Sequence, residues 1–247
     1  MTEARTHTIR FDEGGQKREL LLAHAYYDDS VVDDVSWLVG DEIKTYASFK
    51  ATSRKNEYLA GRILTKKTVI QIHQKYSPID IETTTALWGY PLFKTACFSN
   101  YWLSIAHTTT EAAVLLSQHN THPVGLDVEQ ISEENQNVLQ QFLSKYGRAF
   151  SLQDMHLYWS AKEAASKALR TGFTVPETLF EIEEVKEIGG KYEIKFKNLQ
   201  RLHAVAWIQN DVITCIAYPI EWTFTHIDNP NFFEDIQEKV TKTIDYD

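Results

Sequence analysis

Two acidic residues lie one residue apart in a short apolar stretch, PVGLDVEQ, at residues 123–130. An extended chain alternates its side chains between two faces, so Asp127 and Glu129 point one way, and Leu126 and Val128 point the other. Two carboxylates about 7 Å apart on one face repel each other unless water or a cation lies between them. On a solvated face the pair has no chemical role, whereas facing a cleft it indicates a metal site.

A second group of chemically active side chains lies on YWSAKEAASKALR, residues 158–170, which the pattern predicts to be a helix. A buried stripe at helical spacing is formed by Leu157, Ala161, Ala164, Ala165 and Ala168. The other side carries Trp159, Lys162, Glu163, Ser166, Lys167 and Arg170. Taken alone, Glu163 and Lys167 at i, i+4 predict only a surface ion pair of about 0.3–0.5 kcal/mol.

Taken together, the polar residues of the two segments indicate a site for a metal ion and a phosphate. Asp127, Glu129 and Glu163 form an all-oxygen ligand set of the kind that magnesium prefers, with manganese as an alternative. Magnesium commonly shares its ligand shell with substrate phosphates, and Lys162 and Lys167 would be counter-charges for those phosphates. Carboxylates that bind a cation and lysines that bind an anion act on one ligand if that ligand is phosphorylated. The residues therefore predict a site of the phosphoryl-transfer type.

The two segments resemble the paired signatures of the 4′-phosphopantetheinyl transferase superfamily. VGLDVE is similar to that family's G-[IV]-D-[IV]-E, and WSAKEAASKAL to its W-x-x-K-E-x-x-x-K. Upstream, EYLAGRILTKK is similar to the L-x-G-R segment, and WLSIAHTT to the S-[IL]-S-H-[ST] motif. The motifs occur in the family's order over roughly residues 50–182, and the length of 247 residues resembles the larger monomeric (Sfp-type) branch.

This resemblance implies a role for each matching residue. Asp127, Glu129 and Glu163 would hold magnesium on the diphosphate of coenzyme A. Two of the residues would be catalytic: Glu163 would help to deprotonate the incoming serine, and Lys167 would neutralise charge as adenosine 3′,5′-bisphosphate leaves. The residues expected to bind coenzyme A are Arg54, Arg62, Tyr90, His107, Lys162 and Lys167.

The implied activity is that of a 4′-phosphopantetheinyl transferase, or holo-acyl-carrier-protein synthase. It would transfer the 4′-phosphopantetheinyl group from coenzyme A to a serine of an apo acyl, peptidyl or aryl carrier protein. The expected partners are therefore coenzyme A and an apo carrier protein.

Three positions depart from the family's motifs. Tyr90 stands where the family often has the lysine of a G-K-P segment, so either Lys94 supplies the missing charge or phosphate affinity is lower. Ala106 replaces the second serine of S-[IL]-S-H and removes a hydroxyl that could contact the ligand. Leu126 replaces Ile or Val, a volume-conserving change that we expect to be harmless.

The same resemblance implies an α+β fold of two similar α/β subdomains, each a small antiparallel sheet packed with helices and related by a pseudo-two-fold axis. We place the N-terminal subdomain at residues 1–120 and the C-terminal subdomain, with the metal-binding motifs, at 121–247. The active site is expected at their junction.

The residue pattern predicts the elements that position these side chains. Strands are expected at residues 18–27, 102–106 and 112–116, followed by an antiparallel meander at 191–199, 201–209 and 211–220. Helix is expected over most of residues 30–73. Two further helices are expected within 134–173, with a break near Gly147 and an end at Gly172.

The charge of the chain bears on which partners it could bind. The net charge of −9 argues against nucleic acid as the main partner. Residues 44–75, however, hold eight basic residues against one acid, which suits a phosphate-rich molecule or an acidic protein, or forms a solvated helix face. We expect part of this segment to lie near the mouth of the cleft and to steer an acidic carrier protein, so that reversing Lys66 and Lys67 to Glu would slow carrier modification.

We expect a cytoplasmic monomer with no membrane partner. No apolar run approaches the ~18 residues of a membrane span, and the first residues lack an apolar signal core. Cys97 and Cys215 are far apart and show no metal or redox spacing, so reduced thiols are expected.

Two other functions are compatible with the same residues. One is a catalytically silent module of the same fold that binds a carrier domain or a nucleotide, which the departures at Tyr90 and Ala106 leave open. The other is a different magnesium-dependent enzyme that cleaves a diphosphate with no carrier protein present.

Overall fold

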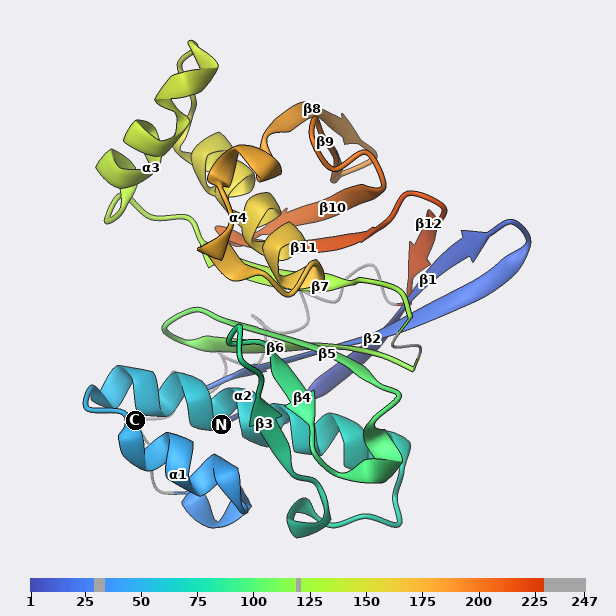
Figure 1. Ribbon diagram of the computed structural model, residues 1–247. Coiled ribbons are helices and arrows are strands. Elements are labelled where there is room, and N and C mark those ends of the chain that lie inside the picture. The colour runs from blue at the N-terminus through green and yellow to red at the C-terminus, as the bar shows by residue number, and fades with distance from the viewer. Residues whose placement is uncertain (29–33, 119–120, 229–247) are drawn as a thin grey trace, which may run out of the picture.

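The computed structural model describes residues 1–28, 34–118 and 121–228. Its elements form four successive layers: helices, a sheet, a second sheet and helices again (Figure 1). All strand pairs in the described residues are antiparallel. The expected α+β fold with two antiparallel sheets is confirmed.

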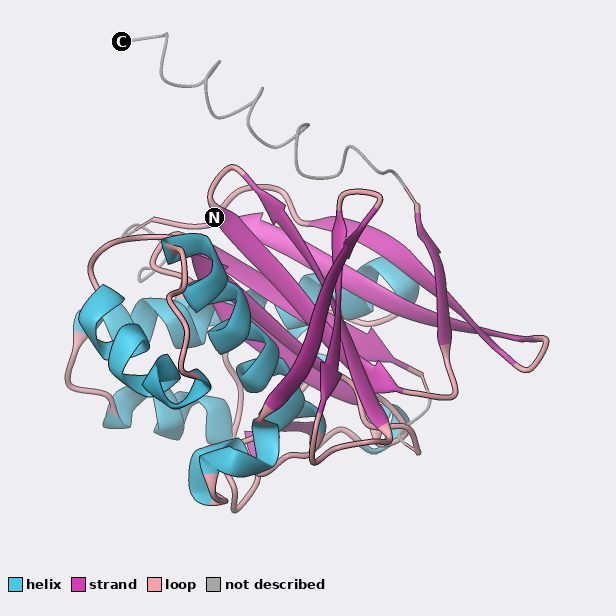
Figure 2. Ribbon diagram, turned by 90° about the horizontal axis from the view of Figure 1, so that it is seen from above, coloured by secondary structure: helices cyan, strands magenta, loops and turns pink. Residues whose placement is uncertain are grey.

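The first sheet is built mainly from the N-terminal part of the chain. Its strands, in spatial order, are β12 (Thr223–Ile227), β1 (Arg5–Glu13), β2 (Gln16–Tyr26), β6 (Glu111–Ser117) and β5 (Trp102–His107). Gly14 and Gly15 turn β1 into β2 with φ values of 57° and 90°, which side-chain-bearing residues rarely adopt. The β1–β2 hairpin projects beyond the rest of the molecule (Figures 1 and 2).

The second sheet contains the predicted meander. Its strands, in spatial order, are β7 (Gly125–Gln130), β11 (Val212–Pro219), β10 (Leu202–Gln209), β9 (Lys191–Phe196) and β8 (Ile182–Ile188). A separate two-stranded hairpin is formed by β3 (Thr83–Thr85) and β4 (Pro91–Phe93).

Helices cover the outer face of each sheet. They are α1 (Asp41–Ser48), α2 (Thr52–Ile72), α3 (Gln136–Leu143) and α4 (Leu152–Ala168). The helical pattern at residues 30–73 is divided into α1 and α2 because Phe49 and Ala51 have extended backbones. The predicted break near Gly147 is confirmed, since this residue has a left-handed φ of 64° between α3 and α4. None of the helices in the described ranges combines the length and apolar character needed to cross a membrane.

The end of α4 differs from the expectation that Gly172 stops it. The helix ends at Ala168, and Arg170 has the left-handed backbone, with φ at 57°. The amide of Thr171 donates to the carbonyl of Ser166 at 3.1 Å, the bond that closes a Schellman-type helix end. Arg170 therefore occupies the terminating position that usually favours glycine, and Gly172 begins the 3-10 turn Gly172–Thr174.

Three clusters of buried side chains hold the layers together. One lies between α4 and the second sheet, and another lies between α2 and the first sheet. The third lies between the two sheets, where Leu22 and Leu115 meet Leu126 and Ile216. Because this central core takes residues from both halves, the two sheets bury apolar surface against each other.

The chain does not divide at residue 120 as simply as predicted. Strand β12 follows the second sheet in the sequence but pairs with β1 at the edge of the first sheet, with Ile9 opposite Ile227. A strand that was placed in the C-terminal subdomain thus completes the N-terminal sheet. The final segment, 229–247, lies outside the described residues.

Candidate active site at the junction of the two sheets

Strands β5 and β7 are each the outermost strand of their sheet, and two side-chain hydrogen bonds join β5 to β7 and to the residue just before it. The amide of Leu126 donates to Ser104 Oγ at 3.0 Å. Trp102 Nε1 donates to the carbonyl oxygen of Val124 at 2.7 Å. The strands that carry the S-I-A-H and G-L-D-V-E motifs therefore lie side by side.

The alternation predicted for β7 is present. Leu126 and Val128 point into the core between the sheets, and both are buried. Asp127 and Glu129 point to the other face, where α4 packs, because Asp127 contacts Lys167 and Glu129 lies near His156. The pair of acids thus lies under a helix and not on an open solvated face.

Asp127 and Lys167 form the central contact of this site. Lys167 Nζ donates to Asp127 Oδ1 at 2.7 Å. Burial alone would lower the pKa of Lys167, but the carboxylates of Asp127 and Glu163 outweigh burial and raise it. The second oxygen, Asp127 Oδ2, is buried and has no hydrogen-bond partner among the described residues. Such an oxygen is costly to bury unless another positively charged or donor group binds it.

Glu163 lies close enough to both acids of β7 to interact with them electrostatically. Burial raises the pKa of Glu163 to about 7, Lys167 opposes this shift, and the charges of Asp127 and Glu129 add to it. A carboxylate with a pKa near neutrality suits general acid–base chemistry at physiological pH.

His156 is a neighbour of this site that the sequence analysis missed. Its Nδ1 lies 3.9 Å from Glu129 Oε2, and its Nε2 lies 2.9 Å from the carbonyl oxygen of Ser132. The nearby Glu129 carboxylate raises the pKa of His156 against the opposing effect of burial. Its spacing was an available signal, because His156 precedes Glu163 by seven residues and lies on the same face of α4.

The three acids are suited to a divalent cation by chemistry, but they do not form a ready-made cage. In residues 1–28, 34–118 and 121–228, no three His, Cys, Asp or Glu side chains are already grouped to hold a metal ion. The ammonium of Lys167 is the cation that contacts Asp127 in this conformation. The hard oxygen ligands and the unpaired Asp127 Oδ2 fit magnesium, which would need the carboxylates to draw closer.

A second cluster of charged side chains lies beside the acidic site and consists of His107, Arg54 and Glu57. Arg54 Nη1 lies 2.8 Å from Glu57 Oε2 and 3.4 Å from His107 Nε2. Burial lowers the pKa of His107, while nearby Glu57 acts in the opposite direction. The charges of Lys167 and Asp127 also act on His107, which connects this cluster to the acidic site across the junction. Glu57 was not predicted, although it follows Arg54 by less than one helical turn.

Arg62 is not brought to His107. It is buried on α2, and its guanidinium carbon lies 4.6 Å from the centroid of the Tyr58 ring. No hydrogen bond or ion pair joins it to His107 or Arg54 within the described part of the chain. Its expected contact with coenzyme A therefore stays a prediction without support from this cluster.

Lys162 is placed differently from the prediction. It is fully buried, forms an ion pair with Glu177, and lies 4.6 Å from the centroid of the Phe142 ring. Burial lowers the pKa of Lys162 to about 8, and Glu177 opposes that shift. Because Lys162 is turned about 100° around α4 from Glu163, it faces α3 and not β7. This placement does not support its expected role as a phosphate contact, which stays a prediction.

Tyr90 contacts a residue that was not predicted as its neighbour. The guanidinium carbon of Arg170 lies 4.7 Å from the Tyr90 ring centroid and 3.4 Å from that of Trp102. Lys94, the residue suggested to replace the missing lysine charge, is engaged elsewhere, at 2.8 Å from Asp41 Oδ2 and 3.0 Å from Glu82 Oε1.

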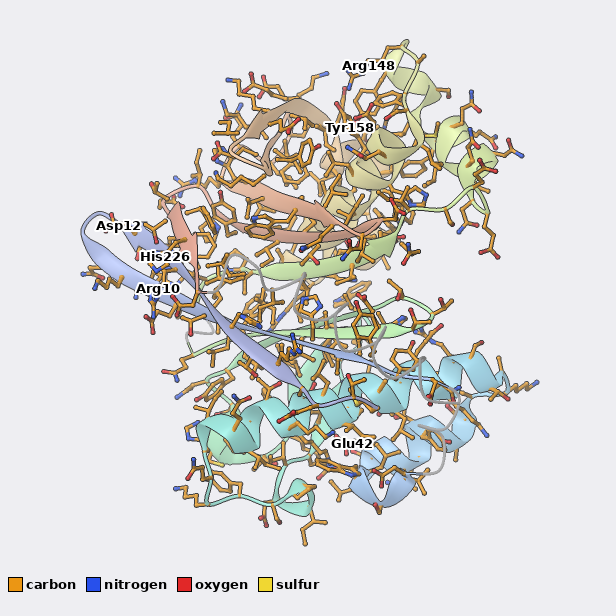
Figure 3. The ribbon with its side chains drawn as sticks, turned by 180° about the vertical axis from the view of Figure 1, so that it is seen from behind. Arg10, Asp12, Glu42, Arg148, Tyr158 and His226 are labelled. Carbon is orange, nitrogen blue, oxygen red and sulfur yellow. The ribbon has the colours of Figure 1, made fainter. Side chains whose placement is uncertain are left out.

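The expectation that Lys66 steers a carrier protein from the cleft mouth is wrong. Lys66 is fully buried and lies 2.7 Å from the equally buried Glu42. Its Nζ also donates to the carbonyl oxygen of Trp37 at 2.6 Å. Glu42 lies in the helical layer of the first sheet, at the end of the molecule remote from the second sheet (Figure 3).

Comparison with known proteins agrees with the motifs of the second half of the chain. Residues 123–226 match the family model described as the 4′-phosphopantetheinyl transferase superfamily. The matched segment contains β7, α4 and the meander, and hence all three acids of the site. No curated protein matches the chain.

Proposed function

We propose that this protein transfers the 4′-phosphopantetheinyl group from coenzyme A to a serine of an apo carrier protein. The observation that supports this most is the arrangement of Asp127, Glu163 and Lys167 between β7 and α4. His107 lies close enough to interact electrostatically with Lys167 and Asp127. This arrangement places carboxylates that can bind a cation beside side chains that can donate hydrogen bonds to phosphates. The family match over residues 123–226 supports the same reaction.

We propose Asp127, Glu129 and Glu163 as the magnesium ligands. Bound magnesium would neutralise diphosphate charge and orient the diphosphate for in-line attack. Lys167 would move its ammonium from Asp127 towards a diphosphate oxygen when the carboxylates engage the cation. His107 and Arg54 would donate hydrogen bonds to a phosphate of the nucleotide.

In the reaction, the serine oxygen of the carrier protein attacks the phosphorus atom that bears the pantetheine. A new P–O bond forms to the serine, and the P–O bond to the leaving adenosine 3′,5′-bisphosphate breaks. The serine proton passes to the Glu163 carboxylate, directly or through one water. Lys167 stabilises the negative charge on the leaving group.

The test is intact-mass analysis of several apo carrier proteins, acyl and peptidyl, after incubation with coenzyme A and magnesium. We expect a gain of one phosphopantetheinyl mass on at least one carrier. Glu163→Gln should lower the rate by about 10²–10⁴-fold, because it removes the proton acceptor and a proposed cation ligand. Glu134→Gln, an exposed acid outside the site, is the matched control and should leave the rate unchanged.

Other outcomes identify the other functions. Coenzyme A binding that needs no magnesium and gives no product would indicate a silent binding module. Cleavage of coenzyme A without any carrier protein would indicate a diphosphate hydrolase. The monomeric Sfp-type assignment is part of the proposal, and a trimer in solution would contradict it.

A further inference from the structure

Arg170 has a backbone conformation that is unfavourable for its residue type. Its φ of 57° lies in the left-handed region, where glycine is preferred at the end of a helix. A non-glycine residue there costs on the order of 1 kcal/mol or more and persists when the surroundings hold it in place. This conformation fixes where the side chain leaves the end of α4.

The side chain of Arg170 crosses from the second half of the chain to the first. Its guanidinium stacks on Trp102 of β5, 3.4 Å from the ring centroid, and also lies 4.7 Å from that of Tyr90. Stacking on Trp102 uses the face of the guanidinium and leaves its edge for hydrogen bonds, one of which involves the Tyr90 side chain. The group is therefore oriented before any ligand arrives.

The charge of Arg170 is not neutralised by a carboxylate. Within the described part of the chain no Asp or Glu oxygen lies within 4.0 Å of its nitrogens, whereas Arg10, Arg18 and Arg54 each have such a partner. Arg170 Nε is buried without a hydrogen-bond partner among those residues. A guanidinium held in place without a carboxylate partner is suited to bind an anion.

The position of Arg170 connects it to the candidate active site. It follows Lys167 by three residues just beyond the end of α4, and its partner Trp102 lies on β5, the strand that also carries His107. Arg170 also lies against Tyr90, the position at which the resembled family often carries a lysine. Lys94 does not supply that charge in this conformation, because Asp41 and Glu82 bind it.

We propose that Arg170 binds a phosphate of coenzyme A and supplies the charge that is missing at Tyr90. The inference deepens the proposed function and rests on it for the identity of the ligand. Tyr90 and Trp102 act as the platform that holds the guanidinium. Arg170 is thus a binding residue contributed by the end of α4.

The test is isothermal titration of the whole protein with coenzyme A, 3′-dephospho-coenzyme A and adenosine 3′,5′-bisphosphate. Arg170→Gly is the main variant, because glycine accepts the left-handed backbone and should fold normally. We expect its Kd for coenzyme A to rise by about 10- to 100-fold, the range of a charge-assisted hydrogen bond. Arg170→Lys keeps the charge but not the planar fork, so its Kd should lie between those of the unchanged protein and Arg170→Gly.

The ligands identify which phosphate Arg170 contacts. If Arg170→Gly weakens binding of coenzyme A but not of 3′-dephospho-coenzyme A, the contact is with the 3′-phosphate. If it weakens binding of both equally, the contact is with the diphosphate.

Arg148→Gly is the matched control. Arg148 also stacks on two aromatic rings, with its guanidinium carbon 4.5 Å from the Phe150 ring centroid and 5.4 Å from that of Tyr158. Figure 3 shows it beside Tyr158 at the far end of the second half, remote from the junction. Its Kd for coenzyme A should equal that of the unchanged protein.

The outcomes separate this inference from the proposed function. If the protein modifies carriers and Arg170→Gly binds coenzyme A as tightly as the unchanged protein, Arg170 only braces the two halves and the inference is overturned. If Arg170→Gly weakens binding of adenosine 3′,5′-bisphosphate but no carrier is ever modified, the inference stands and the proposed function fails. If none of the three ligands binds the unchanged protein, both are overturned.

Discussion

Lys162 and Lys167 show how two similar residues on one helix acquire different roles. Both are close to Glu163 in the sequence, but they lie about 140° apart around the axis of α4. Lys167 faces β7 and contacts Asp127, whereas Lys162 faces α3 and pairs with Glu177. The first is available to a ligand at the junction of the sheets, and the second is enclosed by protein.

Lys162→Met should lower the free energy of unfolding without weakening coenzyme A binding. Methionine keeps most of the buried volume but leaves the partly buried Glu177 with Lys145 as its remaining partner. We expect a loss of about 1–3 kcal/mol in urea denaturation and an unchanged Kd for coenzyme A.

Lys167→Met is the companion variant, and it should raise that Kd by about tenfold or more. An equal rise in the two variants would show that Lys162 reaches the ligand after all.

At the level of elements, the site depends on how closely α4 approaches β7. The alanine stripe of α4 is fully buried against the second sheet, as the sequence pattern predicted. Gly125 at the start of β7 permits the approach, because a Cβ atom there would lie 2.0 Å from the carbonyl oxygen of Ala164 and 2.5 Å from the amide of Ala168. Asp127 follows Gly125 by two residues, so this contact fixes its distance from Glu163.

Gly125→Ala should therefore both destabilise the protein and impair the site. The added methyl group meets backbone atoms, which cannot rotate away, so α4 or β7 must shift. We expect urea denaturation to show a fall of about 3 kcal/mol in the free energy of unfolding. In the proposed transfer reaction, the magnesium concentration that gives half the maximal rate should rise.

Gly61→Ala is the control for this prediction. A Cβ at Gly61 meets only a side-chain atom, Ile105 Cγ2 at 2.9 Å, and alanine gains about 1 kcal/mol of helix propensity. Its stability should stay within about 1 kcal/mol of the unchanged protein. Equal effects of the two substitutions would show that close backbone packing at Gly125 is unimportant.

For the whole molecule, the two halves behave as one structural unit. The core between the sheets draws residues from both, β12 returns to the first sheet, and Ser104 binds the amide of Leu126 across the junction. Residues of the candidate active site come from both sides of this junction, so its geometry depends on the halves staying together.

We expect a single unfolding transition, with coincident midpoints in far- and near-ultraviolet circular dichroism. Ser104→Ala should lower the free energy of unfolding by about 1–3 kcal/mol, because the buried Leu126 amide loses its acceptor, and the transition should stay single. Two separated transitions would contradict the view that the halves unfold together.

The amino-acid sequence by itself determined the local features of this protein. Alternation in β7 placed Asp127 and Glu129 on one face, and the alanine spacing placed the buried side of α4, since both depend only on the period of the backbone. The meander and the break at Gly147 followed from equally local signals. The motifs around Glu163 and His107 indicated which chemistry to expect.

Only the tertiary structure decided which side chains meet. Some contacts join segments that are distant in the sequence, such as the pairing of β12 with β1 and the stacking of Arg170 on Trp102. Others depend on which face of a helix is enclosed, such as the contacts of Lys66 with Glu42 and of Lys162 with Glu177. A residue's type and spacing fix its chemistry and direction along its own element. The packing of that element against others determines whether the same charge lies in a core, in an ion pair or at a ligand site.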